Sequence, residues 1–551
     1  MTQKTNTIPA AVAPAGSWRY WRGLGGWNYY FLLKFGLLWY GYLNFNALAN
    51  LAFMAYLLLP IPNIRLHRLR HWIGLPIAIG LFYHDTWLPG LNSILSQGGQ
   101  LASFSGDYLL ELLQRFINWK MVGAAFILWV AYLFFSLWLR ITTLTVIMLV
   151  WLNLGAVSGP VGGLSPVVER TTAVPAPGVK NEHQDEGEAG APATSQNLRA
   201  YLNAFYEREQ GRQTAFPSTL ATDAQPFDIL LLNICSLSWS DLEMSGLDDH
   251  PLWRHFDVMF TNFNSATSYS GPAGIRLLRA SCGQSPQKDL YQPVDPRCYL
   301  FDNLAQLGFD SRLMMDHTGN FGNYLVDLRR HGNLEAALMP QQGIGHQLVA
   351  FDGEPILNDQ QLLRRWLEQR QSDTEPRSAT FFNLIPLHDG NRWVGERRPA
   401  SFQSRAELLL EQLDAFLEEL EQSGRQVMVL FVPEHGAALG GDRIQLAGLR
   451  DIPNPRVTRV PVGIKLIGMQ RPYQGPRIEV SEPTSYLAIS ELLARMVDGR
   501  AFGEEGVDWQ ALLRDLPRTA LVSDTENAVV IEYQGNDYVS LSGGDWMPYP
   551  R

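Results

Sequence analysis

Cys235, Ser270, Glu434 and His435 are the residues of this chain whose types and surroundings could support chemistry. Cys235 ends the apolar run "LLLNIC", and Glu434 and His435 follow the apolar run "VLFVP". Thiolate, carboxylate and imidazole are ligands that Zn²⁺ accepts, and they would leave the fourth position of a tetrahedral site to the serine oxygen. The sequence therefore predicts a Zn²⁺ site built from these four side chains.

Ser270 precedes Gly-Pro and the segment "AGIRLLRA", a pattern that is typical of a helix start. A helix N-terminus favours an anion, and a serine there could attack phosphorus while free N–H groups hold the phosphoryl oxygens. A free hydroxyl is a poor nucleophile at neutral pH and needs activation. A Zn²⁺ ion would supply it, by lowering the pKa of the hydroxyl and stabilising charge on the phosphoryl group.

Each of these residues also has a structural interpretation. Cys235 fits a small core hydrophobe, since cysteine is among the most often buried residues. Ser270 fits a simple helix N-cap, and Glu434 with His435 fits a solvated loop. His388 follows a further apolar run in "LIPLHDG" and fits either a surface histidine or a member of the site. Only their common position after apolar runs favours a shared site.

The other two cysteines, Cys282 and Cys298, flank the segment "GQSPQKDLYQPVDPR". In an oxidising compartment a disulfide between them is expected, and closing such a loop stabilises a fold by about 3 kcal/mol. That pairing makes Cys235 the odd thiol of the chain.

From Phe227 onward, apolar runs alternate with amphipathic segments. This pattern predicts an α/β domain with a mostly parallel sheet that helices cover on both faces. The predicted strands are Asp228–Ile234, Asp257–Phe260, Ser311–Met315, Thr380–Ile385, Val427–Val432 and Pro461–Ile467. The predicted helices are Gly271–Ala280, Leu300–Leu307, Asp359–Arg370, Ala406–Gln422 and Thr484–Val497. Ligands bind such sheets at the carboxyl ends of the strands, where the site residues would meet. The tail from Ala528 to Tyr549 is predicted to form a hairpin with its turn at "QGND".

The N-terminal part is dense in Leu, Phe, Trp and Tyr, which predicts a helical transmembrane domain of about five spans. The candidate spans are Trp27–Leu43, Asn46–Leu59, Trp72–Leu88, Val122–Leu139 and Ile141–Val157. The distribution of Lys and Arg then places everything after the last span in a bacterial periplasm, with the chain as a multi-pass protein of the inner membrane. The alternative is a soluble protein with buried core helices. The expected domains are a transmembrane domain (1–159), a flexible linker (160–197) and a periplasmic catalytic α/β domain (198–551). The net charge of −10 argues against a nucleic-acid partner.

Four segments carry a resemblance to a known family. "LLLNICSLSW", "NSATSYSGPAG", "LIPLHDG" and "FVPEHGAAL" closely resemble those of enterobacterial cellulose phosphoethanolamine transferases. That family belongs to the alkaline phosphatase superfamily and is related to the lipid A phosphoethanolamine transferases. The wider family has an acidic residue after the first strand, a threonine nucleophile and an Asp-His pair. This chain departs at Cys235, Ser270 and Glu434, which matches the cellulose branch.

The resemblance implies an activity and its partners. The enzyme would move phosphoethanolamine from phosphatidylethanolamine to a glucosyl 6-hydroxyl of nascent cellulose, during the formation of the biofilm matrix. It would act through a covalent phosphoethanolamine-serine intermediate at the membrane, in contact with subunits of the cellulose synthase complex.

The resemblance also implies roles for individual residues. Cys235, Ser270, Glu434 and His435 resemble the zinc ligands, and Ser270 also resembles the nucleophile. The active-site residues implied are Tyr269, His388 as general acid and base, and Arg450 as a contact of a phosphoryl oxygen. Two rivals stay open: a zinc phosphodiesterase or phosphatase of the same fold, and a non-catalytic membrane subunit that braces the synthase.

Overall fold

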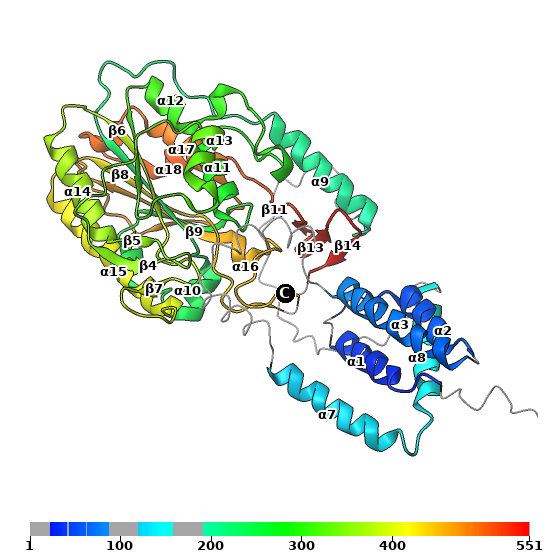
Figure 1. The fold of residues 1–551 in the computed structure, drawn as a ribbon. Helices are drawn as coiled ribbons and strands as arrows, with labels where there is room; N and C mark the ends of the chain where they lie inside the picture. Colours follow the sequence, from blue (N-terminus) through cyan, green and yellow to red (C-terminus); the bar gives the residue numbers. More distant parts are fainter. Residues whose placement is uncertain are drawn as a thin grey trace, which may run out of the picture. The chain divides into compact units, whose positions relative to one another are not determined.

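The computed structural model describes residues 23–40, 43, 45–61, 63–86, 119–157, 191–442 and 444–549. The chain divides into two compact units. The helical unit holds the described residues up to 157, and the α/β unit holds those from 191 onward (Figure 1). Residues 160–190 of the predicted linker (160–197) lie outside the described residues. Helix α9 begins at Ser195, within the last part of that segment.

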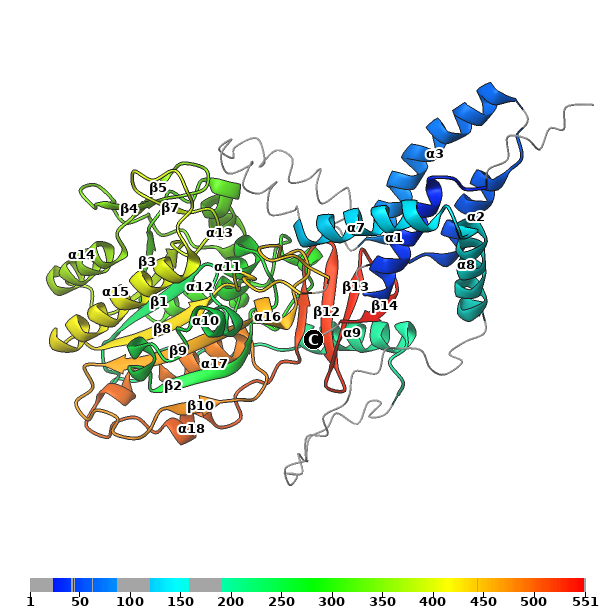
Figure 2. The ribbon, with the colours of Figure 1, turned by 90° about the horizontal axis from the view of Figure 1, so that it is seen from below.

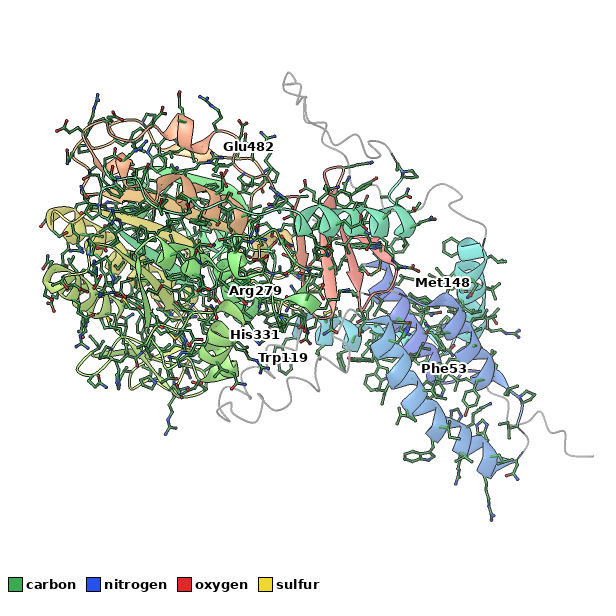
Figure 3. The ribbon with its side chains drawn as sticks, turned by 90° about the horizontal axis from the view of Figure 1, so that it is seen from above. Phe53, Trp119, Met148, Arg279, His331 and Glu482 are labelled. Carbon is green, nitrogen blue, oxygen red and sulfur yellow. A yellow bond between two sulfur atoms is a disulfide. The ribbon has the colours of Figure 1, made fainter. Side chains whose placement is uncertain are left out.

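The helical unit packs around a small apolar core. Phe31, Phe53 and Leu149 are buried there, and Met148 packs against them (Figure 3). A buried ion pair adds to this core, since Lys34 Nζ lies 2.6 Å from Asp85 Oδ2 and both side chains are fully buried. The helices are α1 (Trp27–Trp39), α2 (Ala47–Leu58), α3 (Ile64–Asp85), α7 (Trp119–Phe135) and α8 (Ile141–Val157).

The prediction of about five membrane spans is wrong. Among the described residues, none of the helices combines the length and the apolar character that crossing a membrane requires. Helices α1 and α2 have 13 and 12 residues, and α7 and α8 have 17 each, whereas a span needs about 20. Helix α3 has 22 residues, but Arg65, Arg68 and Arg70 in its first half make it too polar. The prediction from local apolar density therefore assumed longer uninterrupted apolar helices than the chain forms.

A seven-stranded sheet forms the centre of the α/β unit, in the order β10-β2-β9-β8-β1-β6-β3. All neighbours run parallel except β9, which is antiparallel to both β2 and β8. The expected mostly parallel sheet is thus present, with one reversed strand. The strands are β1 (Asp228–Ile234), β2 (Val258–Asn264), β3 (Asp310–Met315), β6 (Ser378–Leu384), β8 (Val427–Pro433), β9 (Arg459–Ile467) and β10 (Ile478–Val480).

Helices cover both faces of this sheet, as expected (Figure 1). In β1, Ile229 and Leu231 face one core, whereas Leu230 and Leu232 face the other, because side chains alternate along a strand. The first face carries α11 (Ser270–Leu278), α12 (Leu300–Gln306), α13 (Tyr324–Gly332), α17 (Tyr486–Met496) and α18 (Trp509–Leu513). The second carries α10 (Trp239–Ser245), α14 (Asp359–Ser372) and α15 (Phe402–Gln422). The short α16 (Pro455–Thr458) precedes β9.

Two smaller antiparallel sheets complete the unit. One has the order β5-β4-β7, and the other has the order β11-β12-β13-β14 and packs beside α9 (Figure 2). The predicted tail hairpin is confirmed, and Gln534 and Gly535 turn it with positive φ angles. The bounds are β4 (His346–Val349), β5 (Pro355–Leu357), β7 (Arg392–Trp393), β11 (Val522–Asp524), β12 (Ala528–Tyr533), β13 (Asn536–Leu541), β14 (Trp546–Pro548) and α9 (Ser195–Gln210).

Two long-range links hold the segments around α11. Cys282 and Cys298 form a disulfide, and Cys235 is a buried free thiol. Arg279 Nε donates a hydrogen bond of 2.6 Å to the carbonyl oxygen of His331, so that the end of α11 is tied to α13 (Figure 3). Both links fix the helix that begins at Ser270.

Candidate active site

The carboxyl ends of β1 and β8 bring Cys235 and Glu434 side by side. Ile234 pairs with Pro433, and the pairing continues beyond the strands, because Glu434 N–H donates to the Ile234 carbonyl at 2.9 Å. On the other side of β1, Cys235 N–H donates to Leu384 at the end of β6. Parallel neighbours therefore place residues distant in sequence at one edge of the sheet.

Ser270 is the first residue of α11, and Tyr269 is its N-cap. The capping interpretation of Ser270 is thus wrong, since Tyr269 and not Ser270 occupies the N-cap position. The hydroxyl oxygen instead lies 3.4 Å from Cys235 Sγ and 3.2 Å from His435 Nε2. The loop after β2 delivers the serine to the edge where β1 and β8 end.

Cys235, Glu434 and His435 form a buried group that could hold a metal ion. One ligand atom from each lies within 4.8 Å of the other two. All three side chains are almost completely buried. With the Ser270 oxygen at its side, the group offers sulfur, oxygen and nitrogen donors, the set from which proteins build zinc sites.

The Glu434 carboxylate is oriented for a further partner. Its Oε1 accepts hydrogen bonds from Tyr324 Oη at 2.9 Å and from Asn383 Nδ2 at 2.7 Å. Its Oε2 is buried and has no hydrogen-bond partner among the described residues. Burial raises the pKa of this carboxyl, and the neighbouring hydroxyl and amide donors oppose that shift. Because buried polar atoms are almost always partnered, the bare oxygen fits a metal ligand.

His435 and Cys235 fit the same interpretation. His435 Nδ1 lies 3.0 Å from the Gly436 carbonyl oxygen and 3.2 Å from Arg450 Nη1. Assigning the imidazole proton to Nδ1 lets it donate to the carbonyl and leaves the Nε2 lone pair toward Ser270. Burial and the Arg450 charge hold the pKa of His435 well below its usual range, so that the ring is neutral. Burial and the Glu434 charge raise the pKa of the Cys235 thiol to about 12, against the opposing charge of Arg450. A thiol in these surroundings ionises only beside a cation, as a thiolate ligand requires.

A cavity of about 360 Å³ opens beside this group. The predicted site residues that line it are Cys235, Tyr269, Ser270, His388, His435 and Arg450. Glu434 is held by hydrogen bonds from Tyr324 and Asn383, two residues that themselves line the cavity. The structure therefore brings together all seven residues named from the sequence.

His388 presents one nitrogen for proton exchange. Its Nδ1 lies 2.9 Å from the Asp389 carbonyl oxygen, to which it donates, and its ring stacks on Phe351 at a centroid distance of 4.4 Å. Burial and the nearby Arg450 lower the pKa of His388 to about 4. A neutral ring with a held Nδ1 leaves Nε2 as the atom that could take a proton.

Hydrogen bonds join the loop that holds Tyr269 to the loop that holds Arg450. Arg450 Nη1 donates to Ser236 Oγ at 3.0 Å, and the Ser268 hydroxyl donates to the Arg450 carbonyl oxygen. Tyr269 Oη donates to Asp451 Oδ1 at 2.6 Å. Among the described residues that line the cavity, Arg450 carries the one permanently cationic side chain. It is therefore placed to meet an anion there.

Sequence reasoning missed three residues of the site. His317 follows β3 in "MMDHTGN" and lines the cavity. The strand-end argument that singled out His388 would also have found it. Asn383 lies within β6 and Tyr324 begins α13, and neither has a sequence signal that points to Glu434.

Fold and site together define an α/β protein with a candidate metal centre and a serine beside it at the carboxyl ends of the strands. Residues 182–546 match the family of the cellulose biosynthesis protein BcsG C-terminal domain, and residues 27–154 match that of the BcsG N-terminal domain. The chain belongs to the BcsG family, which confirms the family indicated by the sequence motifs.

Two relatives match over their whole length. The cellulose biosynthesis protein BcsG of Salmonella typhimurium is 55% identical to this chain, and that of Escherichia coli K12 is 54% identical; the matches cover 100% of each chain.

Solved structures give weaker matches. A protein in the alkaline phosphatase superfamily from Vibrio parahaemolyticus is 11% identical, with a TM-score of 0.45 over 64% of this chain and 91% of that one. The C-terminal periplasmic domain of phosphoethanolamine transferase EptC from Campylobacter jejuni is 13% identical, with a TM-score of 0.33 over 51% and 91%. Nothing about function follows from likenesses at this level.

Proposed function

We propose that this chain is a zinc-dependent phosphoethanolamine transferase that acts on cellulose. It takes phosphoethanolamine from phosphatidylethanolamine, holds it covalently on Ser270 and passes it to a glucosyl 6-hydroxyl. The observation that carries the proposal is the Ser270 hydroxyl, which lies 3.4 Å from Cys235 Sγ and 3.2 Å from His435 Nε2 at the wall of a cavity. The names of the full-length relatives, cellulose biosynthesis proteins, support cellulose as the acceptor.

The zinc ion would be held by Cys235, Glu434, His435 and the Ser270 oxygen. When bound, it supplies a lower pKa for the serine hydroxyl and stabilisation of charge on the phosphoryl group. The N-terminal end of α11 adds a favourable field for an anion next to Ser270. Arg450 adds a guanidinium at the cavity wall, where it fits a phosphoryl oxygen.

The transfer then needs two displacements at phosphorus. In the first, a bond forms from Ser270 Oγ to phosphorus, the bond to the diacylglycerol oxygen breaks, and that oxygen receives the proton that the serine lost. In the second, the glucosyl oxygen bonds to phosphorus, the bond from phosphorus to Ser270 Oγ breaks, and the proton that the glucosyl oxygen loses passes to Ser270 Oγ. His388 Nε2 is the candidate to carry these protons, because Nδ1 already donates its hydrogen bond to the Asp389 carbonyl oxygen.

Mass spectrometry of the Ser270 peptide tests the proposal. Full-length protein incubated with phosphatidylethanolamine vesicles should carry phosphoethanolamine on Ser270, and added cello-oligosaccharide should remove the adduct and become labelled. The Ser270→Ala variant should form neither product, whereas Ser372→Ala, at an exposed serine at the end of α14, should form both. Free phosphoethanolamine as the sole product would establish the hydrolase alternative. Normal labelling of cellulose by Ser270→Ala would exclude a catalytic serine.

A further inference from the structure

The small β5-β4-β7 sheet brings an acidic loop into the wall of the cavity. Strands β4 and β5 form a tight hairpin, in which Ala350 N–H donates to the Glu354 carbonyl at 2.8 Å and Gly353 turns the chain with a φ of +97°. The turn places Phe351, Asp352 and Glu354 among the lining residues. These side chains therefore face the same space as Ser270.

Asp352 and Glu354 are half-buried carboxylates whose described donors are all neutral. Asp352 Oδ1 accepts from the Glu354 N–H at 3.0 Å. Glu354 accepts from the Thr318 hydroxyl and, at 3.5 Å, from Asn320 Nδ2. In the described part of the chain neither carboxylate pairs with a basic side chain. Two negative charges held partly out of water without a cation favour a ligand that brings one.

His317 offers a further acceptor in the same wall. The residue is only 8% exposed, and its Nδ1 lies 2.8 Å from Asp316 Oδ1, so that a proton assigned to Nδ1 is donated to that carboxylate. The remaining nitrogen, Nε2, has no hydrogen-bond partner among the described residues, although the ring lines the cavity. Burial lowers the pKa of His317 to about 4, against the charges of Glu434, Glu354 and Asp352. The ring is thus a neutral acceptor within electrostatic reach of both the candidate metal centre and the acidic loop.

Aromatic rings complete this wall. Phe351 meets Phe321 edge to face at 4.5 Å and stacks on His388 at 4.4 Å. Both phenylalanines line the cavity. Aromatic faces attract a cation, and they exclude the water that would otherwise screen the carboxylates.

We propose that Asp352, Glu354 and His317, beside the Phe321–Phe351 wall, form the subsite for the primary ammonium of the phosphoethanolamine group. The inference rests on the proposed function and adds the feature that selects the headgroup. The three ammonium protons match the two carboxylates and the free imidazole nitrogen. The β4–β5 hairpin then recognises the amine, while Arg450 and the Ser270 region receive the phosphoryl group.

Equilibrium binding tests the subsite without requiring turnover. Zinc-loaded full-length protein is titrated by calorimetry with phosphorylethanolamine and with propyl phosphate, which has the same shape but a methyl in place of the ammonium. Wild type should bind the amine at least about 10-fold more tightly, the usual size of a charge-assisted hydrogen bond. Asp352→Asn and Glu354→Gln should each reduce that preference severalfold and together abolish it.

Glu526→Gln is the matched control, because Glu526 also lines the cavity but is exposed and lies outside the hairpin. It should keep the wild-type preference, and bound zinc should be equal in every variant. An equal preference for the two ligands in wild type, an unchanged preference in the double variant, or an equal loss in Glu526→Gln would overturn the subsite. Zinc loss in the hairpin variants would do the same, by assigning the carboxylates to a metal. Detection of the Ser270 adduct tests the proposed transferase function independently of these binding measurements. The ammonium subsite and the transferase function can therefore each be refuted without the other.

Discussion

The hydroxyl of Tyr324 should tune the metal affinity of the site through the carboxylate of Glu434. It donates to Glu434 Oε1 at 2.9 Å, and Asn383 is the second donor to the same oxygen. These two bonds hold Oε1, whereas Oε2 has no hydrogen-bond partner in the described part of the chain, and a carboxylate oxygen of Glu434 lies within 4.8 Å of ligand atoms of Cys235 and His435. Tyr324→Phe removes one of the two donors while it keeps the ring in the core.

The size of the effect follows from the kind of bond that is lost. A hydrogen bond to a charged group is worth about 1.5–3 kcal/mol, and loss of a group that orients a metal ligand costs about 10- to 100-fold in affinity. Asn383 still holds Oε1 in the variant. We therefore expect the lower end of that range, a loss of about 10-fold or ~1.4 kcal/mol.

Competition with a chromogenic chelator measures zinc affinity in the wild type and in the variants. Tyr486→Phe is the matched control, since the Tyr486 hydroxyl is buried and has no hydrogen-bond partner in the described part of the chain. Its zinc affinity should stay near the wild-type value. Unchanged affinity in Tyr324→Phe, or an equal loss in both variants, would refute the role assigned to this hydrogen bond. Thermal unfolding of each variant confirms that the fold is kept.

Three further perturbations test other parts of the structure. Cys235→Ala should lose bound zinc and activity while the disulfide survives, and full zinc occupancy by metal analysis would return Cys235 to a purely structural role. Cys282→Ser should destabilise the chain by about 3 kcal/mol, because its bond to Cys298 closes a loop of sequence separation 16; unchanged denaturant unfolding would contradict this. Lys34→Met should cost about 3–5 kcal/mol by leaving the buried Asp85 carboxylate unpaired, and an unshifted thermal transition of the helical unit would exclude it.

The sequence by itself predicted six of the seven strands of the central sheet and the side chains that gather at the candidate site. Strand β1 was predicted at its observed bounds, and the other predicted strands of the central sheet were also found. Buried strands are recognisable because they are short apolar runs with polar or turn residues at both ends. The convergence of Cys235 and Glu434 followed from parallel pairing, which places the carboxyl ends of neighbouring strands at one edge.

The helical unit shows where the same reasoning failed. Apolar density predicted membrane spans, but the described helices are too short or, in α3, too polar. Composition reports how apolar a segment is. The length of an uninterrupted helix also depends on where breaks and charged residues fall, and those positions decided against spans.

Only the tertiary structure decided how the site is completed. The Ser270 hydroxyl could equally have capped its helix, and its direction toward Cys235 and His435 appears only when α11 is packed on the sheet. Tyr324 and the acidic β4–β5 hairpin come from elements far away in the chain. Spacing and periodicity describe neighbours along the chain, whereas ligand orientation and a subsite are made by contacts across it, which only the packed fold supplies.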